Sequence, residues 1–374
     1  MKKTALILTL VLTAAPAYAQ LGGLGRAIKK ADDAKQKVDK VKDLHISEAD
    51  ERKIGEAVSE KVRTEFGVFQ NQAVTKYVTL VGTVVARASS RPDLKWEFIV
   101  LDTDGVNAFA SPGGLVHITR GALGMIKSEA ELAGVLGHEI AHVTRKHTVN
   151  AIQKNKAVEL GVDVAPGSNE YIQGIANAAY DNIVEKGFDR GDEEDADENG
   201  IRLANKVGYN PSGLGAFLTK LMERNKAQTD ERNGLFASHP ETKGRISDLG
   251  KQIRSEKLNA TAMVQPRYAS HITWDVKPIS EVATVVAGTR GVAGSGGAKE
   301  KPAEKEEPKK KGFGLGALNL TKGKQAESTQ ASASAGNRAV GTDRAAKGGP
   351  NPSKLRIPAL TPAELEAFKK GIAG

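Results

Sequence analysis

The chain has 374 residues, a net charge of +9 and no cysteine, so it can bury a sizeable core but cannot form disulfides or carry a lipidated N-terminal cysteine. The charge is uneven: residues 1–43 carry +5, residues 298–374 carry +7, and residues 44–297 carry −3. The basic excess belongs to the two ends. This argues against a specific nucleic-acid reader and favours tails that are solvated linkers or that contact an anionic envelope surface weakly.

Residues 1–19 have the form of a signal peptide. Lys2 and Lys3 precede an apolar run, and Ala17-Tyr18-Ala19 is the small-x-small pattern of a signal-peptidase site. We expect cleavage after Ala19 and export to the periplasm rather than to the medium. The apolar run is too short to span a bilayer, and no later stretch approaches the ~20 apolar residues that a transmembrane helix needs. We therefore expect a protein that is not transmembrane.

Composition divides the remaining chain into four segments. Residues 20–46 are glycine-rich and then charged in both signs, which predicts a flexible arm. Residues 47–290 show regular apolar periodicity and form the expected folded domain. Residues 291–360 are rich in Gly, Ser, Ala, Lys and Glu, which is typical of a disordered tail. Residues 361–374 begin with a capping box and predict a short C-terminal helix over 362–371.

Two amphipathic helices open the expected domain. The first begins after Ser47, an N-cap residue with Asp50 three positions later, and the second covers about 72–88. Apolar residues recur on one face of each helix. The expected buried stripes are Ile54, Val58 and Val62 in the first, and Val74, Tyr77, Val78, Val81 and Val85 in the second.

Residues 95–119 alternate apolar and polar positions and are rich in β-branched and aromatic side chains, which predicts two or three strands. Ser128, with Glu131 at the capping-box position, then opens a central helix that we expect to continue to about Val149. Helices should follow at about 170–186, 190–208, 211–226 and 240–255. The expected fold is α+β, mainly helical with a small β-sheet.

The central helix contains the motif His138-Glu139-Ile140-Ala141-His142. Residues four apart on a helix share one face, so His138 and His142 can direct both imidazoles at one cation. Glu139 is rotated about 100° from His138 and can border the site as a general base without being a ligand. The alternative is that these are ordinary surface or core histidines, so a third ligand is the test.

A catalytic zinc takes three protein ligands and keeps one position open for water. A metzincin would place a third histidine at position 148, which is Thr148, so that class is excluded. The acidic segment 188–200 instead offers Glu193, with Asp197 one helical turn later. Glu193 can ligate while Asp197 holds the second ring nitrogen of a ligand histidine. Without a metal, such a charge cluster would be a solvated helix face.

Five segments, in chain order, resemble the gluzincin metallopeptidases of the HtpX and BepA type, which are related to the CAAX prenyl proteases. They are VNAFASPGGLVHITRGAL (106–123), ELAGVLGHEIAHVTRKH (131–147), FDRGDEEDADENG (188–200), VGYNP (207–211) and SHPETKGRI (238–246). The resemblance implies a zincin-like domain whose sheet edges the active-site cleft, with one zinc per chain. It also implies Glu193 as the third ligand and Asp197 as the carboxylate that holds a ligand histidine. The family often has Glu where this chain has Asp195.

The same resemblance assigns a substrate-binding edge to the strand and turn before the central helix, where Gly and Pro alone would indicate a plain hairpin. The residues concerned are Asn107, Ala108, Phe109, Gly113 and Gly114.

The resemblance also places His239 near the zinc, because Ser238-His239-Pro240 is similar to a family motif. His239 would then act catalytically by stabilising the oxyanion, or would occupy the open position and hold the enzyme inactive. Arg245 is expected to anchor this segment. His147, five residues after His142, is predicted to be structural, because it would lie off the ligand face of a continuous helix. The remaining histidines are expected to be ordinary: His45, His117 and His271.

We therefore predict an exported zinc metalloendopeptidase that hydrolyses peptide bonds of envelope proteins, in protein quality control. Its partners would be protein or peptide substrates, and its cofactor one Zn²⁺ per chain. The alternative is an envelope assembly or chaperone-like factor in which proteolysis is rare or regulated.

Overall fold

The computed structural model describes residues 46–159, 167–225, 239, 242–278, 281–282, 284–285, 338–339, 354–355 and 357–373. The compact unit that contains the central helix is formed by residues 46–152 and 164–374. The predicted signal peptide, the arm apart from Ile46, and most of the predicted low-complexity tail lie outside the described residues. Within the described part of the chain, no helix is long and apolar enough to cross a membrane.

The first two helices form as the sequence predicts. They are α2 (Glu48–Phe66) and α3 (Gln72–Arg87). The side-chain oxygen of Ser47 accepts a hydrogen bond from the Asp50 backbone N–H at 3.1 Å and so caps the first turn of α2. Every residue of the two predicted apolar stripes is buried. Amphipathic periodicity therefore identifies the core faces of both helices correctly.

Residues 97–119 form a three-stranded sheet. Its strands are β1 (Glu97–Leu101), β2 (Ala108–Ser111) and β3 (Leu115–Thr119). They lie in the order β1-β3-β2, with β1 parallel and β2 antiparallel to the middle strand. Side chains on both faces of β2 and β3 are buried, because helices cover the sheet. A further two-stranded pair joins β4 (Thr284–Val285) to β5 (Arg338–Ala339).

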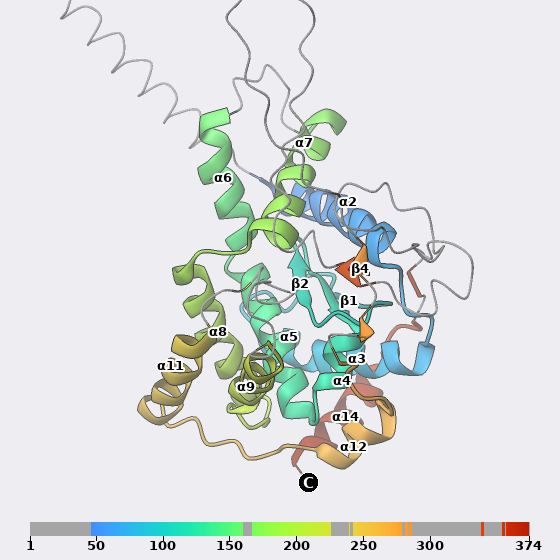
Figure 1. The fold of residues 1–374 in the computed structure, drawn as a ribbon, viewed down its shortest axis with the longest axis vertical. Coiled ribbons are helices and arrows are strands. Elements are labelled where there is room, and N and C mark those ends of the chain that lie inside the picture. The colour runs from blue at the N-terminus through green and yellow to red at the C-terminus, as the bar shows by residue number, and fades with distance from the viewer. Residues whose placement is uncertain are drawn as a thin grey trace, which may run out of the picture. The chain divides into compact units, whose positions relative to one another are not determined.

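The central helix is α5 (Glu129–Thr144), which follows the short α4 (Arg120–Met125). Ser128 caps α5, and its side chain accepts from the Glu131 backbone N–H at 3.2 Å. Every side chain from Glu129 to Val143 is buried, because α5 is surrounded by other elements. It packs against β2, α3, α8 (Arg190–Lys206) and α9 (Gly213–Asn225), at the centre of Figure 1.

The predicted continuation of the central helix to Val149 is wrong. Helix α5 ends at Thr144, Lys146 adopts a left-handed backbone conformation with φ 59°, and α6 (His147–Glu159) begins directly after it. A left-handed residue cannot continue a right-handed helix. Arg91 donates to the Val143 carbonyl at 3.3 Å and so satisfies a backbone acceptor that the helix end exposes. Apolar residues continue at helical spacing across this break, so the sequence pattern predicts one continuous helix.

The other predicted helices are present, with small changes at their ends. They are α7 (Asn169–Tyr180), which continues into a π-helical turn η1 (Asp181–Lys186), then α8, α9 and α11 (Thr242–Ser255). The sequence did not predict α12 (Gln265–His271). The C-terminal helix α14 (Pro362–Ala373) packs against α3 with Leu365 and Ile372 buried. The predicted α+β fold, mainly helical with a small sheet, is confirmed.

Candidate metal centre

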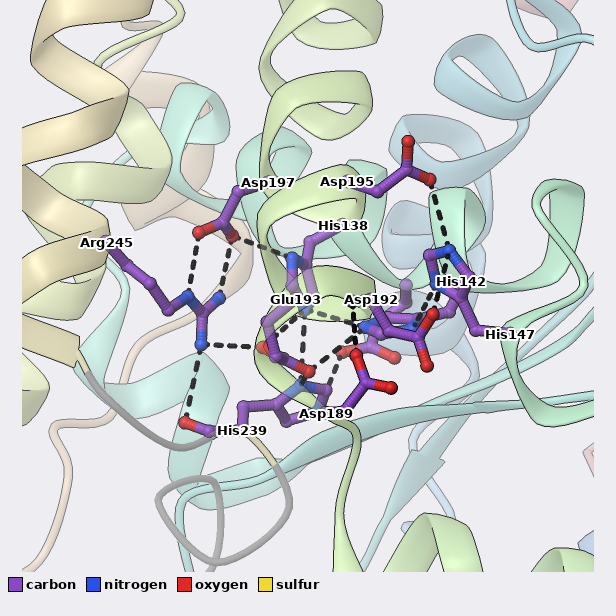
Figure 2. Close-up of polar contacts among 11 residues, drawn as sticks. His138, His142, His147, Asp189, Asp192, Glu193, Asp195, Asp197, His239 and Arg245 are labelled. Atoms are coloured by element: carbon purple, nitrogen blue, oxygen red, sulfur yellow. Dashed lines mark hydrogen bonds and ion pairs between the residues drawn. The ribbon is translucent and has the colours of Figure 1, made fainter. Parts of the chain in front are cut away.

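Four buried side chains converge between α5, α8 and the segment before α11. They are His138 and His142 from α5, Glu193 from α8, and His239. Each offers one ligand atom, and these four atoms all lie within 4.8 Å of one another. Figure 2 shows the side chains pointing toward a common centre. The structure thus brings together the three ligands that the sequence predicts and His239, which the resemblance also placed near the zinc.

The distances between these ligand atoms fit one tetrahedral zinc ion. Atoms bound at 2.0–2.1 Å from zinc at the tetrahedral angle lie about 3.3 Å apart. Nε2 of His138 is 3.0 Å from Nε2 of His142 and 3.6 Å from Oε2 of Glu193. Nε2 of His142 is 3.4 Å from Oε1 of Glu193. The two distances to Glu193 involve different carboxylate oxygens, so the three residues approach the ligand spacing of a zinc site with one oxygen near each histidine.

The contact of His138 with Asp197 leaves Nε2, the ring nitrogen that faces the cluster, available to a cation. Its Nδ1 lies 2.9 Å from Oδ1 of Asp197 without the alignment of a hydrogen bond, and the negative charge of this carboxylate favours the neutral tautomer that carries its proton on Nδ1. The Nε2 atom is then a bare lone pair aimed into the cluster. Orientation of a ligand histidine by a carboxylate is typical of zinc sites. The structure thus places Asp197 where the sequence predicts it.

Arg245 on α11 contacts two carboxylates of α8, those of Asp197 and Glu193. It donates to the two carboxylate oxygens of Asp197 at 2.7 Å each, and its Nη1 lies 2.7 Å from Oε2 of Glu193. Arg245 also donates to the backbone carbonyl of His239 at 3.3 Å. The expected anchoring of this segment by Arg245 is therefore visible in its contacts, as Figure 2 shows.

Glu193 remains ionised in spite of its burial. Burial by itself raises the pKa of Glu193, but the charges of His239, Arg245 and His138 together outweigh it and hold the pKa well below its usual value. Burial lowers the pKa of His142 far below its usual value, so this imidazole is neutral. The carboxylate of Glu193 and the neutral imidazole of His142 are the forms in which these two side chains bind a divalent metal.

Glu139 lies beside the cluster without joining it. Its Oε1 is 3.6 Å from Nε2 of His239. Within the described part of the chain, Oε2 of Glu139 and Nε2 of His239 are buried polar atoms that make no hydrogen bond. Burial raises the pKa of Glu139. A water or a substrate group would satisfy these two atoms, which is the chemistry expected next to an open metal position.

His147 contacts the metal cluster, although the sequence predicts only a structural role for it. Its Nδ1 lies 3.0 Å from Nδ1 of His142, on the side of the ring that faces away from the cluster. The break at Lys146 brings it there, so the assumption of a continuous helix fails. The contact of His147 with His142 could have been predicted only from a sequence pattern that marks the helix break at Lys146. The sequence contains no such pattern.

The predicted substrate-binding residues lie on β2 and the turn that follows it. The side chains of Ala108 and Phe109 are buried in the core, so any contact with a peptide would fall to the backbone. The Gly113 carbonyl accepts from Arg52 at 3.1 Å, and a Cβ atom at Gly113 would lie 2.7 Å from the Arg52 Cα. Close packing against α2 therefore requires glycine at position 113, independently of any contact between the turn and a substrate. Asn107 precedes β2, and its side chain accepts from the Ala108 N–H at 2.9 Å.

Comparison with known proteins agrees with this geometry. Residues 72–253, about half of the chain, match Peptidase family M48. The beta-barrel assembly-enhancing protease of Yersinia pestis is 24% identical over 227 residues, which cover 58% of this chain and 46% of that protein. The mitochondrial metalloendopeptidase OMA1 of Schizosaccharomyces pombe is 29% identical over 202 residues, covering 53% and 60%.

A further relative, the metalloprotease YcaL of Escherichia coli, is 26% identical over 159 residues, covering 41% of this chain and 61% of that protein. The chain thus spans about half the length of the curated relatives it matches. The matched region contains α5, α8 and all four residues of the cluster. Residues 72–253 thus form a peptidase family M48 domain, and the prediction of a metallopeptidase is confirmed at the level of this family.

Proposed function

We propose that this protein is an exported zinc-dependent endopeptidase that hydrolyses peptide bonds of cell-envelope proteins in protein quality control. The observation that carries the proposal is the convergence of His138, His142 and Glu193 at the spacing of a tetrahedral zinc, with Glu139 beside them. Oxygen and imidazole donors in this number are the ligand set of catalytic zinc.

Each residue of the site has a separate role in the proposed hydrolysis. A bound zinc would lower the pKa of a water molecule toward about 7 and polarise the scissile carbonyl. Glu139 takes the proton of the attacking water and delivers it to the nitrogen of the leaving amine. Burial raises its pKa, which suits this role, because a carboxylate of higher proton affinity is a stronger general base. Asp197 and Arg245 keep His138 and Glu193 in position.

The envelope as the place of action is supported by the N-terminal sequence and by relatives. The predicted signal peptide implies export. Several of the matched relatives are proteases named for enhancing β-barrel assembly. We infer from both that the substrates are envelope proteins, with the periplasm as the compartment.

His239 favours regulated rather than constant proteolysis. Its Nδ1 lies 3.2 Å from Nε2 of His138, close to the spacing between the three expected ligands, and 2.7 Å from Oε1 of Glu193, which is a hydrogen-bond distance. A fourth protein ligand would fill the position that a catalytic water needs. We infer that His239 restrains hydrolysis until substrate displaces it, which supports the second candidate function: an assembly or chaperone-like factor with rare proteolysis.

The first test is metal content, measured by mass spectrometry on the purified mature protein beside Glu193→Ala. We expect about one zinc per chain, lost or strongly weakened in the variant. Absence of zinc from the wild-type protein would overturn the proposal.

A second test addresses turnover. Glu139→Gln should keep the zinc and lose peptidase activity, since the amide cannot act as a base. Undiminished activity in this variant would exclude the assigned role. If Glu139→Gln still supports the cellular function, the assembly-factor alternative is favoured.

His239→Ala separates the two roles of that residue. If His239 restrains the enzyme, peptidase activity rises in the variant. If it stabilises the oxyanion instead, activity falls by about 10²–10³-fold, which is typical for loss of one such donor.

A further inference from the structure

His147 contacts the expected metal ligand His142 on the side of its ring that faces away from the cluster. His147 is buried, its Nδ1 lies 3.0 Å from Nδ1 of His142, and its Nε2 lies 3.1 Å from Oδ2 of Asp195. Figure 2 shows the three side chains in a row that leads away from the cluster. The ring of Phe188 stacks on His142 with centroids 3.9 Å apart, so the ligand ring is held on its face as well as at its outer edge.

The backbone is built to make this contact. In a continuous helix, a residue five positions after His142 would point about 140° away from it. Lys146 instead has φ 59°, which ends α5 and turns the chain so that His147 faces back toward His142. Lysine in a left-handed conformation is unfavourable by roughly 1 kcal/mol or more. The surrounding contacts, including the one between His147 and His142, offset this.

The positions of the protons follow from the order of the three groups. A metal on Nε2 of His142 requires that nitrogen to be a lone pair, so the proton of neutral His142 is on Nδ1. This N–H donates to Nδ1 of His147, which must therefore be unprotonated. The proton of His147 is then on Nε2, where it donates to the carboxylate of Asp195. One arrangement of protons satisfies every contact in the row.

We propose that His147 is a positioning residue that fixes the tautomer and ring orientation of the zinc ligand His142, through the row formed by Asp195, His147 and His142. Its role parallels that of Asp197 toward His138, but it is indirect: the carboxylate acts through a second imidazole. The proposal rests on the zinc centre proposed above and deepens it. It also gives a function to Asp195, the position at which this chain departs from the usual glutamate.

The test measures zinc affinity of the full-length mature protein by competition with a chromophoric chelator. His147→Leu and His147→Asn form a matched pair of similar size and branching. Asparagine places an oxygen acceptor near the position of Nδ1, whereas leucine has none. We expect leucine to weaken zinc binding 10–100-fold, which is typical for loss of an outer-sphere partner, and asparagine to restore it to within about 3-fold of wild type.

Rescue by asparagine is the outcome that a merely structural histidine would not produce. Equal weakening in both variants, or wild-type affinity in both, would overturn the proposal. Failure of the wild-type protein to bind zinc would overturn the zinc centre itself, so the two failures are distinguishable. Thermal unfolding of the metal-free variants checks that leucine and asparagine destabilise the fold equally.

A coupling experiment keeps the proposal falsifiable if the leucine variant does not fold. Asp195 is at the partly exposed end of the row, so Asp195→Ala should be tolerated. Alone it should weaken zinc binding several-fold. In a His147→Asn background it should have no further effect, since the row is already cut between residues 147 and 195. Independent effects of the two substitutions would contradict a connected row.

Discussion

Gly137 and Gly200 bring the backbones of α5 and α8 into direct contact. A Cβ atom at Gly137 would lie 2.8 Å from the carbonyl oxygen of Gly200, and a Cβ atom at Gly200 would lie 2.7 Å from the backbone nitrogen of His138. Both distances are too short for a side chain. This contact fixes the separation of the helices that carry the expected zinc ligands, so Glu193 reaches His138 and His142 only because two glycines meet.

Gly200→Ala should therefore push α8 away from α5 and displace Glu193. We expect zinc affinity to fall at least 10-fold and the free energy of unfolding to fall by about 1–3 kcal/mol, as for overpacking elsewhere. Chelator competition and chemical denaturation measure the two effects. Gly215→Ala on α9 is the matched control, because a Cβ there meets nothing within 4 Å. Wild-type zinc affinity in Gly200→Ala would show that the helix contact does not position Glu193.

Zinc should stabilise the folded protein. A ligand that binds only the native state stabilises it by about 2.7 kcal/mol at a free concentration 100 times its Kd. We expect the melting temperature to rise with zinc concentration in the wild-type protein and to fall after chelation. Glu193→Ala should show little dependence on zinc. A melting temperature of the wild type that is independent of both zinc and chelator would contradict a native zinc site.

The buried carboxylate of Glu129 at the start of α5 depends on Arg267. Tyr77 and Tyr209 donate to it at 2.8 Å each, and Arg267 contacts both of its oxygens. Burial and the charge of Glu129 raise the pKa of both tyrosines, so their hydroxyls remain donors. Arg267→Met would leave the carboxylate without its cation. We expect a loss of about 3 kcal/mol in unfolding free energy, measured by denaturation, against almost none for the exposed Arg254→Met.

Helix α14 should contribute to the stability of the domain. Leu365 and Ile372 are buried, and the guanidinium of Arg267 lies 4.1 Å from the centroid of the Phe368 ring. Leu365→Ala should lower the unfolding free energy by about 2–4 kcal/mol, because it opens a cavity. Lys370→Ala on the exposed face of the same helix is the control. Equal stability of the two variants would mean that α14 does not remain docked in solution.

Burial of His117 predicts a dependence of stability on pH. Burial lowers the pKa of His117 to about 3 in the folded protein, against roughly 6.5 when unfolded. Between these values the unfolded state binds the extra proton, so this contribution to stability is complete above about pH 6.5 and is lost as the pH falls toward 3. The loss from this group is on the order of 3 kcal/mol by about pH 4.

His117→Gln removes the titrating group but keeps a polar atom near Ser59, whose hydroxyl lies 2.9 Å from Nε2 of His117. We expect the melting temperature of this variant to fall less steeply than that of the wild type between about pH 6.5 and 4. Identical slopes in the two proteins would show that His117 does not carry this dependence.

Much of the fold could be read from the sequence, because the features concerned are local. Ser47 and Ser128 cap their helices through contacts three residues away, and apolar periodicity marks the buried faces of α2 and α3. The break at Lys146 was missed, because neither its left-handed backbone nor the return of His147 to His142 has a signature in residue spacing.

The sequence by itself determined that two histidines share one face of a buried helix, that a glutamate lies next to them, and that an acidic helix offers a third ligand. Helical geometry relates residues four apart without further information. Only the tertiary structure decided that Glu193 and His239 reach that face, that His147 supports it, and that two glycines set the spacing. These contacts join residues far apart in the chain or across a helix break, and packing, which no local pattern records, brings them together.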